Sequence, residues 1–355
     1  MEVIGGVFFR DDSIVDRNQL VKMVNLLTHR SGHQRTTFCR NSVGLFNLRK
    51  PSSFQVESPI SYEGLVVFSN ARIDNTLDLQ TSLGFSSSSK IEKNELFARA
   101  YLKWGDSFGN QLLGVFTIVI WDQVKEELFM LCDQIGIRSL FYYIDDKKLV
   151  FCNEINALRQ FVSFQINRSQ IPYYLTYTDR AGERIETLIK NVYLFARGKS
   201  MKVSNHKVQS SIYYRLIEHV DNSGANYSDE EYGLIFHEKF RKAVRRRLEG
   251  SSYIGAELSG GLDSSYICAM AGNIYGASYS LPVYHIKPEG NGTDESSFAK
   301  LVARHSQLQY NEVRAHSTFR DLSYYSEILG LPIEQYHTGV TVSYTHLTLP
   351  TTPYV

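Results

Sequence analysis

The chain has 355 residues, 43% of them hydrophobic and 21% charged, so it is long enough for about two domains with buried cores and is not globally disordered. Its 38 Lys and Arg residues against 37 Asp and Glu residues leave a net charge of +1, which argues against a bulk electrostatic nucleic-acid binder and against a polybasic membrane anchor. No apolar run approaches the ~18 residues of a spanning helix, and the first residues lack the basic start of a secretory signal, so we expect a cytoplasmic protein with no membrane partner.

The first half of the sequence is typical of short strands with few helices. Runs of β-branched and aromatic residues predict strands over 3–9, 64–69, 115–121, 127–131, 140–144 and 149–152. Helices are predicted over 19–27, from the spacing of its apolar residues, and over 95–103. The polar segments 122–126 and 145–148 are hairpin-like connections, and hairpins pair their strands antiparallel. This half is therefore predicted to be an α+β domain with an antiparallel sheet.

A polar segment, DNSGANYSD at 221–229, is the expected linker, so the first domain is predicted at 1–220. Beyond it, helices are predicted over 229–248, 264–271 and 295–306, and strands over 253–258 and 280–286. The alternation of helices and strands predicts a parallel α/β sheet. The first of these helices carries an apolar stripe formed by Leu234, Ile235, Phe240, Val244 and Leu248.

Four cysteines, Cys39, Cys132, Cys152 and Cys268, lie far apart in the sequence. None forms a CxxC pair, so neither a zinc site nor a disulfide framework is indicated. We expect buried thiols in a reducing compartment.

The segment LSGGLDSS, residues 258–265, lies where a predicted strand ends and a helix begins. Gly260 and Gly261 allow positive φ and close approach of a ligand, and the serines offer hydroxyl donors. A helix N-terminus adds unpaired N–H groups and a partial positive charge. Together these features predict an anion-binding loop; the alternative is an ordinary strand-to-helix turn with serine caps. The predicted site residues are Leu258, Ser259, Gly260, Gly261, Leu262, Asp263, Ser264 and Ser265, with Val283 on the next strand.

Asp263 would repel a bare phosphate, so it needs another role in such a loop. It could cap helix N–H groups, or it could hold the Mg²⁺ that accompanies phosphates. The segment lacks the Gly-Lys-Ser/Thr ending of a Walker A loop and does not match G-x-G-x-x-G, so neither γ-phosphate transfer nor dinucleotide binding is indicated.

LSGGLDSS resembles the pyrophosphate-binding loop of the asparagine synthetase family of ATP pyrophosphatases. The resemblance implies ATP and Mg²⁺ as cofactors, with the loop holding the β and γ phosphates while a substrate carboxylate attacks the α phosphate. An acyl-adenylate and pyrophosphate would form, and an amine would then displace AMP. Leu258 and Val283 would flank adenine, and Asp294-Glu295 would be the family's acidic pair; alternatively, that pair merely favours a helix N-terminus.

The first half resembles the glutaminase domain of the same family, which has an N-terminal-nucleophile (Ntn) hydrolase fold. The matching stretches are 114–121, 132–142 and 152–158. That domain uses a cysteine at residue 2, whose own amine activates the thiol, but this chain has Glu2. The family's Asn-Gly-Glu is replaced by Asn70-Ala71-Arg72. We therefore predict an inactive glutaminase, as in lasso-peptide cyclases and β-lactam synthetases, which use an amine already on the substrate; a precursor-peptide partner would fit this branch.

The C-terminal part departs from the family. The predicted nucleotide domain covers 229–340 without the family's second glycine-acidic loop, and 341–355 resembles a translated sequencing adaptor, so we expect a non-native tail and a longer true protein. The histidines of this half are assigned no catalytic role: His285, His305, His316 and His337. Two alternatives to the amide ligase stay open, namely a truncated or degenerate ATP-binding pseudo-enzyme and another enzyme of this nucleotide fold, such as an RNA thiolase.

Overall fold

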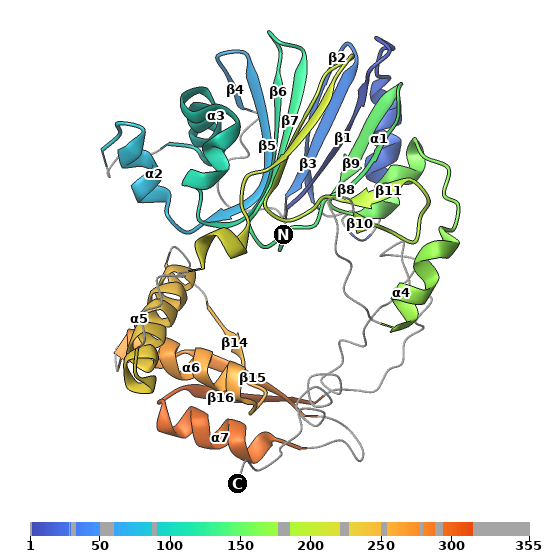
Figure 1. Cartoon of the computed structure of the whole chain (residues 1–355). Coiled ribbons are helices and arrows are strands. Elements are labelled where there is room, and N and C mark those ends of the chain that lie inside the picture. The colour runs from blue at the N-terminus through green and yellow to red at the C-terminus, as the bar shows by residue number, and fades with distance from the viewer. Residues whose placement is uncertain are drawn as a thin grey trace. The chain divides into compact units, whose positions relative to one another are not determined.

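The computed structural model (Figure 1) describes residues 2–27, 29, 33–49, 60–86, 91–176, 185–220, 227–249, 254–276, 280–287 and 294–314. These residues fall into two compact units, unit 1 up to residue 220 and unit 2 from residue 227. The predicted tail at 341–355, together with His316 and His337, lies outside the described residues. None of the described helices combines the length and the apolar composition that crossing a bilayer requires.

Unit 1 is built on two antiparallel sheets. In the first, the strand order is β10 (Ile185–Glu186), β11 (Val192–Leu194), β8 (Phe141–Ile144), β9 (Lys148–Cys152), β1 (Val3–Phe9), β3 (Val43–Arg49) and β2 (Gln34–Arg40). In the second, it is β13 (Val208–Ile212), β12 (Lys199–Val203), β7 (Glu127–Cys132), β6 (Gly114–Asp122), β5 (Leu65–Ile73) and β4 (Ile60–Tyr62). Both predicted hairpins are present, since β6 pairs with β7 and β8 with β9 in antiparallel register.

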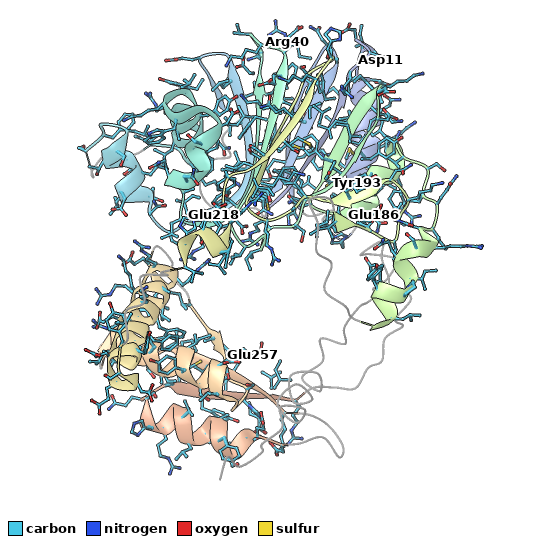
Figure 2. All side chains as sticks on the ribbon, viewed as in Figure 1. Asp11, Arg40, Glu186, Tyr193, Glu218 and Glu257 are labelled. Atoms are coloured by element: carbon cyan, nitrogen blue, oxygen red, sulfur yellow. The ribbon has the colours of Figure 1, made fainter. Side chains whose placement is uncertain are left out.

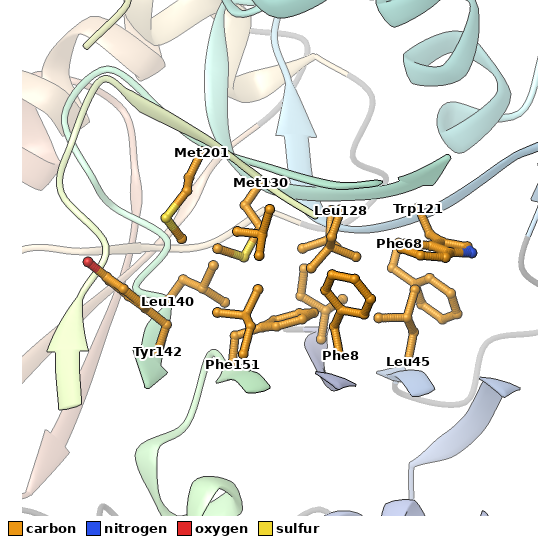
Figure 3. Close-up of a cluster of buried hydrophobic side chains, with 14 of the residues drawn as sticks. Phe8, Leu45, Phe68, Trp121, Leu128, Met130, Leu140, Tyr142, Phe151 and Met201 are labelled. Atoms are coloured by element: carbon orange, nitrogen blue, oxygen red, sulfur yellow. The ribbon is translucent and has the colours of Figure 1, made fainter. Parts of the chain in front are cut away.

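The core of unit 1 lies between the two sheets (Figure 3). Alternate side chains of each strand point into it, as expected for a sheet with one face against another sheet. Each large apolar side chain buried in this way contributes about 1.5–3 kcal/mol to folding. The larger side chains come from both sheets and include Phe8, Leu45, Tyr142 and Phe151 from the first and Phe68, Trp121, Leu128, Met130 and Met201 from the second.

Helices cover the outer face of each sheet. α1 (Arg17–Asn25) and the 3₁₀ helix η3 (Ile155–Gln160) bury their apolar residues against the first sheet. α2 (Thr76–Ser82), α3 (Lys93–Trp104) and η2 (Gly105–Gln111) do the same on the second. Unit 1 also contains η4 (Arg168–Gln170), α4 (Ile171–Thr176) and η5 (Leu216–His219). The four layers confirm the predicted α+β domain with an antiparallel sheet sandwich.

Unit 2 contains a parallel sheet in the order β14 (Ala256–Glu257), β15 (Pro282–Lys287) and β16 (Gln309–Arg314). Its helices are α5 (Asp229–Leu248), α6 (Leu262–Tyr275) and α7 (Ser296–His305). The predicted parallel α/β sheet is confirmed, and β16 is a strand that the sequence did not predict. The core residues are Val244, Leu258, Cys268, Met270, Ala271, Leu281, Val283, Ala299, Ala303 and Leu308.

The apolar stripe of α5 is packed along only part of its length. Val244 is buried, and Phe240 and Leu248 pack against the core, whereas Leu234 is 69% exposed and Ile235 is also exposed. The helix starts well before its packed part because a capping box fixes its first turn: the Ser228 hydroxyl accepts from the Glu231 N–H, and the Glu231 carboxylate accepts from the Ser228 N–H.

Candidate functional site

The LSGGLDSS segment forms the connection between β14 and α6. The Leu258 N–H donates to the Tyr284 carbonyl at 2.9 Å, which extends the β14–β15 ladder by one bond. Gly260 then turns the chain with φ +99°, and α6 begins at Leu262. Gly261 has φ −72°, so Gly260 alone uses the positive φ that both glycines allow. The predicted order of strand, turn and helix is therefore present, with β14 shorter than the predicted strand and α6 longer than the predicted helix.

Gly260 has a packing role that the sequence did not indicate. A Cβ at this position would lie 2.8 Å from the Glu295 carbonyl oxygen and 3.0 Å from the Glu295 Cβ. Contacts this short are not tolerated between non-bonded atoms, so any side chain would push the start of α7 away. The close approach that only glycine permits here is therefore between the loop and α7.

Two of the three predicted hydroxyl donors are used inside the loop. The Ser259 and Ser264 hydroxyls lie 2.8 Å apart, and the Gly261 N–H donates to the Ser259 hydroxyl at 3.2 Å. The Ser264 hydroxyl also accepts from the Ser259 N–H at 3.1 Å. The Ser265 hydroxyl oxygen differs, because it is buried and has no hydrogen-bond partner among the described residues. Ser259 and Ser264 thus shape the loop, and Ser265 keeps an unsatisfied polar group.

The first turn of α6 faces solvent. Leu262 is 79% exposed, and Asp263 is exposed as well. The Ser265 N–H donates to the Gly261 carbonyl at 3.1 Å. In an α-helix the preceding N–H groups have no intrahelical acceptor, so those of Leu262, Asp263 and Ser264 remain at an open surface. An anion would meet several main-chain donors and the positive end of the helix dipole here.

Asp263 stands beside these donors as an exposed carboxylate. The described residues contain no group of three or more His, Cys, Asp or Glu side chains that could hold a metal ion by themselves. Mg²⁺ usually binds through one or two carboxylates together with phosphate oxygens and water, so a single exposed aspartate suits a metal that arrives with a nucleotide. The predicted metal role of Asp263 therefore stays a prediction that the surroundings of Asp263 permit.

Leu258 and Val283, the predicted neighbours of adenine, are fully buried. Both side chains belong to the core of unit 2, and Ala256 pairs with Val283 across the β14–β15 ladder. Glu257, between Ala256 and Leu258, is exposed on the sheet (Figure 2). In the described unit the side chains of Leu258 and Val283 do not reach the surface, and their contact with a base stays a prediction.

The acidic pair Asp294-Glu295 lies at the start of α7. The Asp294 carboxylate accepts from the Ser296 N–H at 2.9 Å and from the Ser296 hydroxyl, and it lies 3.3 Å from the Lys287 ammonium. The hydrogen bond from the Ser296 hydroxyl is the main reason why the pKa of Asp294 falls to about 2. Asp294 thus accepts from the N–H group of the first residue of α7, and Glu295, the N-cap residue, provides the backbone on which Gly260 packs.

Sequence reasoning gave His285 no role, yet it contacts the predicted loop. His285 is 2% exposed, and its Nδ1 lies 2.9 Å from the Leu258 carbonyl oxygen. Its Nε2 lies 3.1 Å from the Ser296 hydroxyl. One signal in the sequence pointed this way: His285 follows Val283 by two residues in a strand, so it shares the buried face.

In unit 1 the side chain at residue 2 is engaged in ion pairs. The Glu2 carboxylate lies 3.1 Å from the Arg49 Nε and 3.5 Å from the Lys93 ammonium. The Asn47 amide also donates to it, at 3.5 Å. Arg72, at the place of the family's glutamate, is paired with Asp74 at 3.0 Å. The residue-2 position therefore holds a neutralised carboxylate.

The four cysteines of the chain are free thiols, and three of them are buried. Burial raises the pKa of the Cys132 and Cys152 thiols, and it raises that of Cys268 to about 11. Burial also raises the pKa of the half-buried Cys39. A thiol with a raised pKa is a poor nucleophile at neutral pH.

Two protein families match this chain. Residues 2–214 match the glutamine amidotransferase domain, and residues 236–327 match asparagine synthase. The first match covers nearly all of unit 1 and the second most of the described part of unit 2. Both resemblances inferred from the sequence are confirmed.

The chain is also similar to individual curated proteins. "Amidase chry2" of Gibberella zeae is 26% identical over 255 residues, which cover 66% of this chain and 37% of that protein. The glutamine-hydrolysing asparagine synthetase of Gallus gallus is 27% identical over 256 residues, covering 69% and 43%. Asparagine synthetase 2 of Bacillus subtilis, also named glutamine-hydrolysing, is 23% identical over 259 residues, covering 70% and 34%. The chain thus spans less than half the length of these relatives.

Proposed function

The chain belongs to the asparagine synthetase family, with a glutamine amidotransferase domain followed by an asparagine synthase domain, and on this premise we propose that it is an ATP-dependent ligase that forms carbon–nitrogen bonds. In the proposed reaction, a carboxylate oxygen of the substrate attacks the α phosphorus of ATP and the bond to the pyrophosphate oxygen breaks. The nitrogen of an amine then attacks the acyl carbon, AMP leaves and an amide forms. The products are AMP, pyrophosphate and the amide.

The observation that carries this proposal is the open first turn of α6. Pyrophosphate is the leaving group, so negative charge grows on it as the α phosphorus is attacked. Main-chain donors of Leu262, Asp263 and Ser264 are available to receive this charge, and the Ser265 hydroxyl in the same turn is buried without a partner among the described residues. An ordinary strand-to-helix turn has no need for a buried hydroxyl without a partner.

We assign the binding of Mg²⁺ to Asp263, the one acidic side chain in the first turn of α6. Bound Mg²⁺ would neutralise part of the phosphate charge. Asp263 would otherwise repel the nucleotide, so the metal gives this carboxylate a favourable role at an anion site.

The amine of the reaction is proposed not to come from glutamine hydrolysis in unit 1. A Glu2 carboxylate that is already paired with Arg49 and Lys93 cannot act as the thiol nucleophile. The amine is then ammonia or a group on the substrate itself. This proposal includes asparagine formation from ammonia and ring closure of a peptide or β-lactam precursor, with a precursor peptide as a partner in the second case.

The test is carboxylate-dependent exchange of labelled pyrophosphate into ATP, measured beside equilibrium binding of Mg·ATP. We expect Mg·ATP to bind, and one class of carboxylate to support exchange. Asp263→Ala should abolish exchange while the circular dichroism spectrum stays unchanged. Binding without exchange over a broad panel of carboxylates would identify an ATP-binding pseudo-enzyme, and absence of binding would refute the nucleotide site itself.

A further inference from the structure

We propose that His285 is a positioning residue for the LSGGLDSS loop, which it holds in place by bridging the Leu258 carbonyl and the Ser296 hydroxyl. The inference rests on the proposed function, since it concerns the loop assigned to the pyrophosphate of ATP. Neither the family matches nor the sequence pattern gave this histidine a role. The support comes from three observations: the partner of each ring nitrogen, the groups around the ring, and the contact between the loop and α7.

The Nδ1 side of the ring fixes the end of β14. The register of β14 and β15 ends at the pair Glu257–Tyr284, and the Leu258 N–H still donates to the Tyr284 carbonyl. The Leu258 carbonyl oxygen faces Nδ1 of His285 at 2.9 Å. A carbonyl oxygen only accepts, so Nδ1 carries the proton. The imidazole thus supplies the donor for the last carbonyl before the turn.

The Nε2 side of the ring fixes the start of α7. Nε2 lies 3.1 Å from the Ser296 hydroxyl, which also contacts the Asp294 carboxylate. Because the pKa of Asp294 is about 2, the carboxylate is ionised at neutral pH and can only accept. The single Ser296 proton serves either Asp294 or Nε2. Leu258, His285, Ser296 and Asp294 therefore form one series of polar contacts across unit 2, in which the Ser296 proton is shared between two acceptors.

The surroundings of the ring hold it in this orientation. His285 is paired with Glu312 in the β15–β16 register, and its ring stacks on Tyr310 with 6.2 Å between the ring centroids. Glu312 is itself paired with Lys300 of α7 at 3.3 Å. Lys287, two residues along β15, is paired with Asp294. The charged groups around His285 are thus balanced in pairs.

The loop lies between the two elements that His285 joins. Only Ser259, Gly260 and Gly261 separate Leu258 from the first residue of α6. Gly260 packs on the Glu295 backbone, one residue before the Ser296 that His285 contacts. A shift of either Leu258 or the start of α7 would therefore move the donors of the first turn of α6. We infer that the bridge sets their direction.

The experiment compares Mg·ATP binding by the full chain and by four variants. His285→Leu removes both hydrogen bonds, whereas His285→Asn keeps a donor for the Leu258 carbonyl. Ser296→Ala removes the hydroxyl that contacts both Nε2 and the Asp294 carboxylate, and it leaves the hydrogen bond between Nδ1 and the Leu258 carbonyl in place. His305→Leu, at the exposed end of the same unit's α7, is the matched control because it makes the same substitution away from the loop.

We expect His285→Leu to weaken Mg·ATP binding by at least about tenfold, His285→Asn to recover most of that loss, and Ser296→Ala to lie between. His305→Leu should bind like the unmodified chain. Recovery by asparagine distinguishes positioning from filling of the core, because asparagine fills the space less well than leucine. Equal binding by His285→Leu and the unmodified chain would overturn this inference and leave the proposed function intact. Failure of the unmodified chain to bind would overturn both.

A second measurement covers the case in which His285→Leu does not fold. The ring nitrogens of His285 are followed by ¹⁵N NMR in the unmodified chain during titration with Mg·ATP. We expect Nδ1 to be the protonated nitrogen and both ring signals to shift on saturation, while those of His305 stay in place. Ring signals of His285 that do not respond to bound Mg·ATP would contradict the coupling of this bridge to the loop.

Discussion

The polar groups at the residue-2 position of unit 1 have partners inside the unit, whereas some of those at the loop of unit 2 do not. At the residue-2 position of unit 1, the Glu2 carboxylate forms ion pairs with Arg49 and Lys93, so its charge is balanced inside the unit. At the loop of unit 2, the Ser259 and Ser264 hydroxyls contact each other, the Ser265 hydroxyl is buried without a partner among the described residues, and the first N–H groups of α6 are left for an external partner. A domain of one family can thus keep its scaffold while the residue at position 2 finds its counter-ions inside the domain.

The largest effect is expected for Gly260→Ala, which tests whether the loop of unit 2 must keep its backbone position. The added Cβ would meet the Glu295 carbonyl, and φ +99° is itself strained for alanine. We expect carboxylate-dependent pyrophosphate exchange to fall by at least about a hundredfold, because the loop or α7 must move. The measurement is the exchange rate at saturating Mg·ATP.

Gly276→Ala is the matched control for this variant. Gly276 follows α6 and also has positive φ (+62°), but a Cβ added there would have no atom within 4 Å. Gly276→Ala should lower the free energy of unfolding by about 1 kcal/mol, through backbone strain alone, and leave the exchange rate unchanged. Equal loss of exchange in both variants would mean that strain, and not the contact with α7, explains the effect.

A second prediction concerns the internally satisfied polar groups of unit 1. Asp133 is fully buried, and its carboxylate accepts from the N–H groups of Phe116, Ile135, Gly136, Ile137 and Arg138. Asp133→Ala leaves these donors without an acceptor, so we expect a loss of about 3–5 kcal/mol in the free energy of unfolding, measured in urea.

Asp133→Asn gives the control for Asp133→Ala. Its amide oxygen keeps one acceptor, and its NH₂ group faces N–H donors, so it should recover only part of the stability. A change below about 1 kcal/mol for Asp133→Ala would show that this turn is not held by the carboxylate.

Much of the fold was predictable because the buried strands of unit 1 are continuous apolar runs, such as GVFTIVIW in β6. Among the missed strands, β2 (QRTTFCR) and β16 (QYNEVR) lie at sheet edges, where polar residues are tolerated. The missed strands β3, β11 and β12 instead have a neighbouring strand on each side. The loop was predictable because its glycines and serines are adjacent in sequence. The His285 bridge and the packing of Gly260 on Glu295 were not, since they join residues 27 to 35 positions apart through the pairing of β14 with β15.

A third prediction concerns the ion pairs of Glu2 in unit 1. Glu2→Ala would leave the Arg49 and Lys93 charges without their carboxylate, so we expect a loss of about 1 kcal/mol in the free energy of unfolding. The control is Glu218→Ala, which removes the well-exposed ion pair with Arg215 at 3.9 Å and should leave the free energy of unfolding unchanged. Pyrophosphate exchange should be unchanged in Glu2→Ala, and a large loss of exchange would show that residue 2 takes part in the reaction.

The smallest expected effect is a change in the pKa of Asp294, which lies just before α7. The Ser296 hydroxyl, followed by the Ser296 N–H and Lys287, lowers the pKa of Asp294 from 3.8 to about 2, so this carboxylate stabilises the folded chain above pH 4 and ceases to do so as the pH falls from about 4 to about 2. In Ser296→Ala we expect the ¹³C NMR titration midpoint of the Asp294 carboxyl to move back toward 3.8. The Asp11 carboxyl of unit 1, whose pKa is lowered by Ser13, is the internal reference and should not move. An unchanged Asp294 midpoint would mean that the N–H of residue 296 and Lys287, and not the Ser296 hydroxyl, hold the charge, and the series of polar contacts from Leu258 would then end at Ser296.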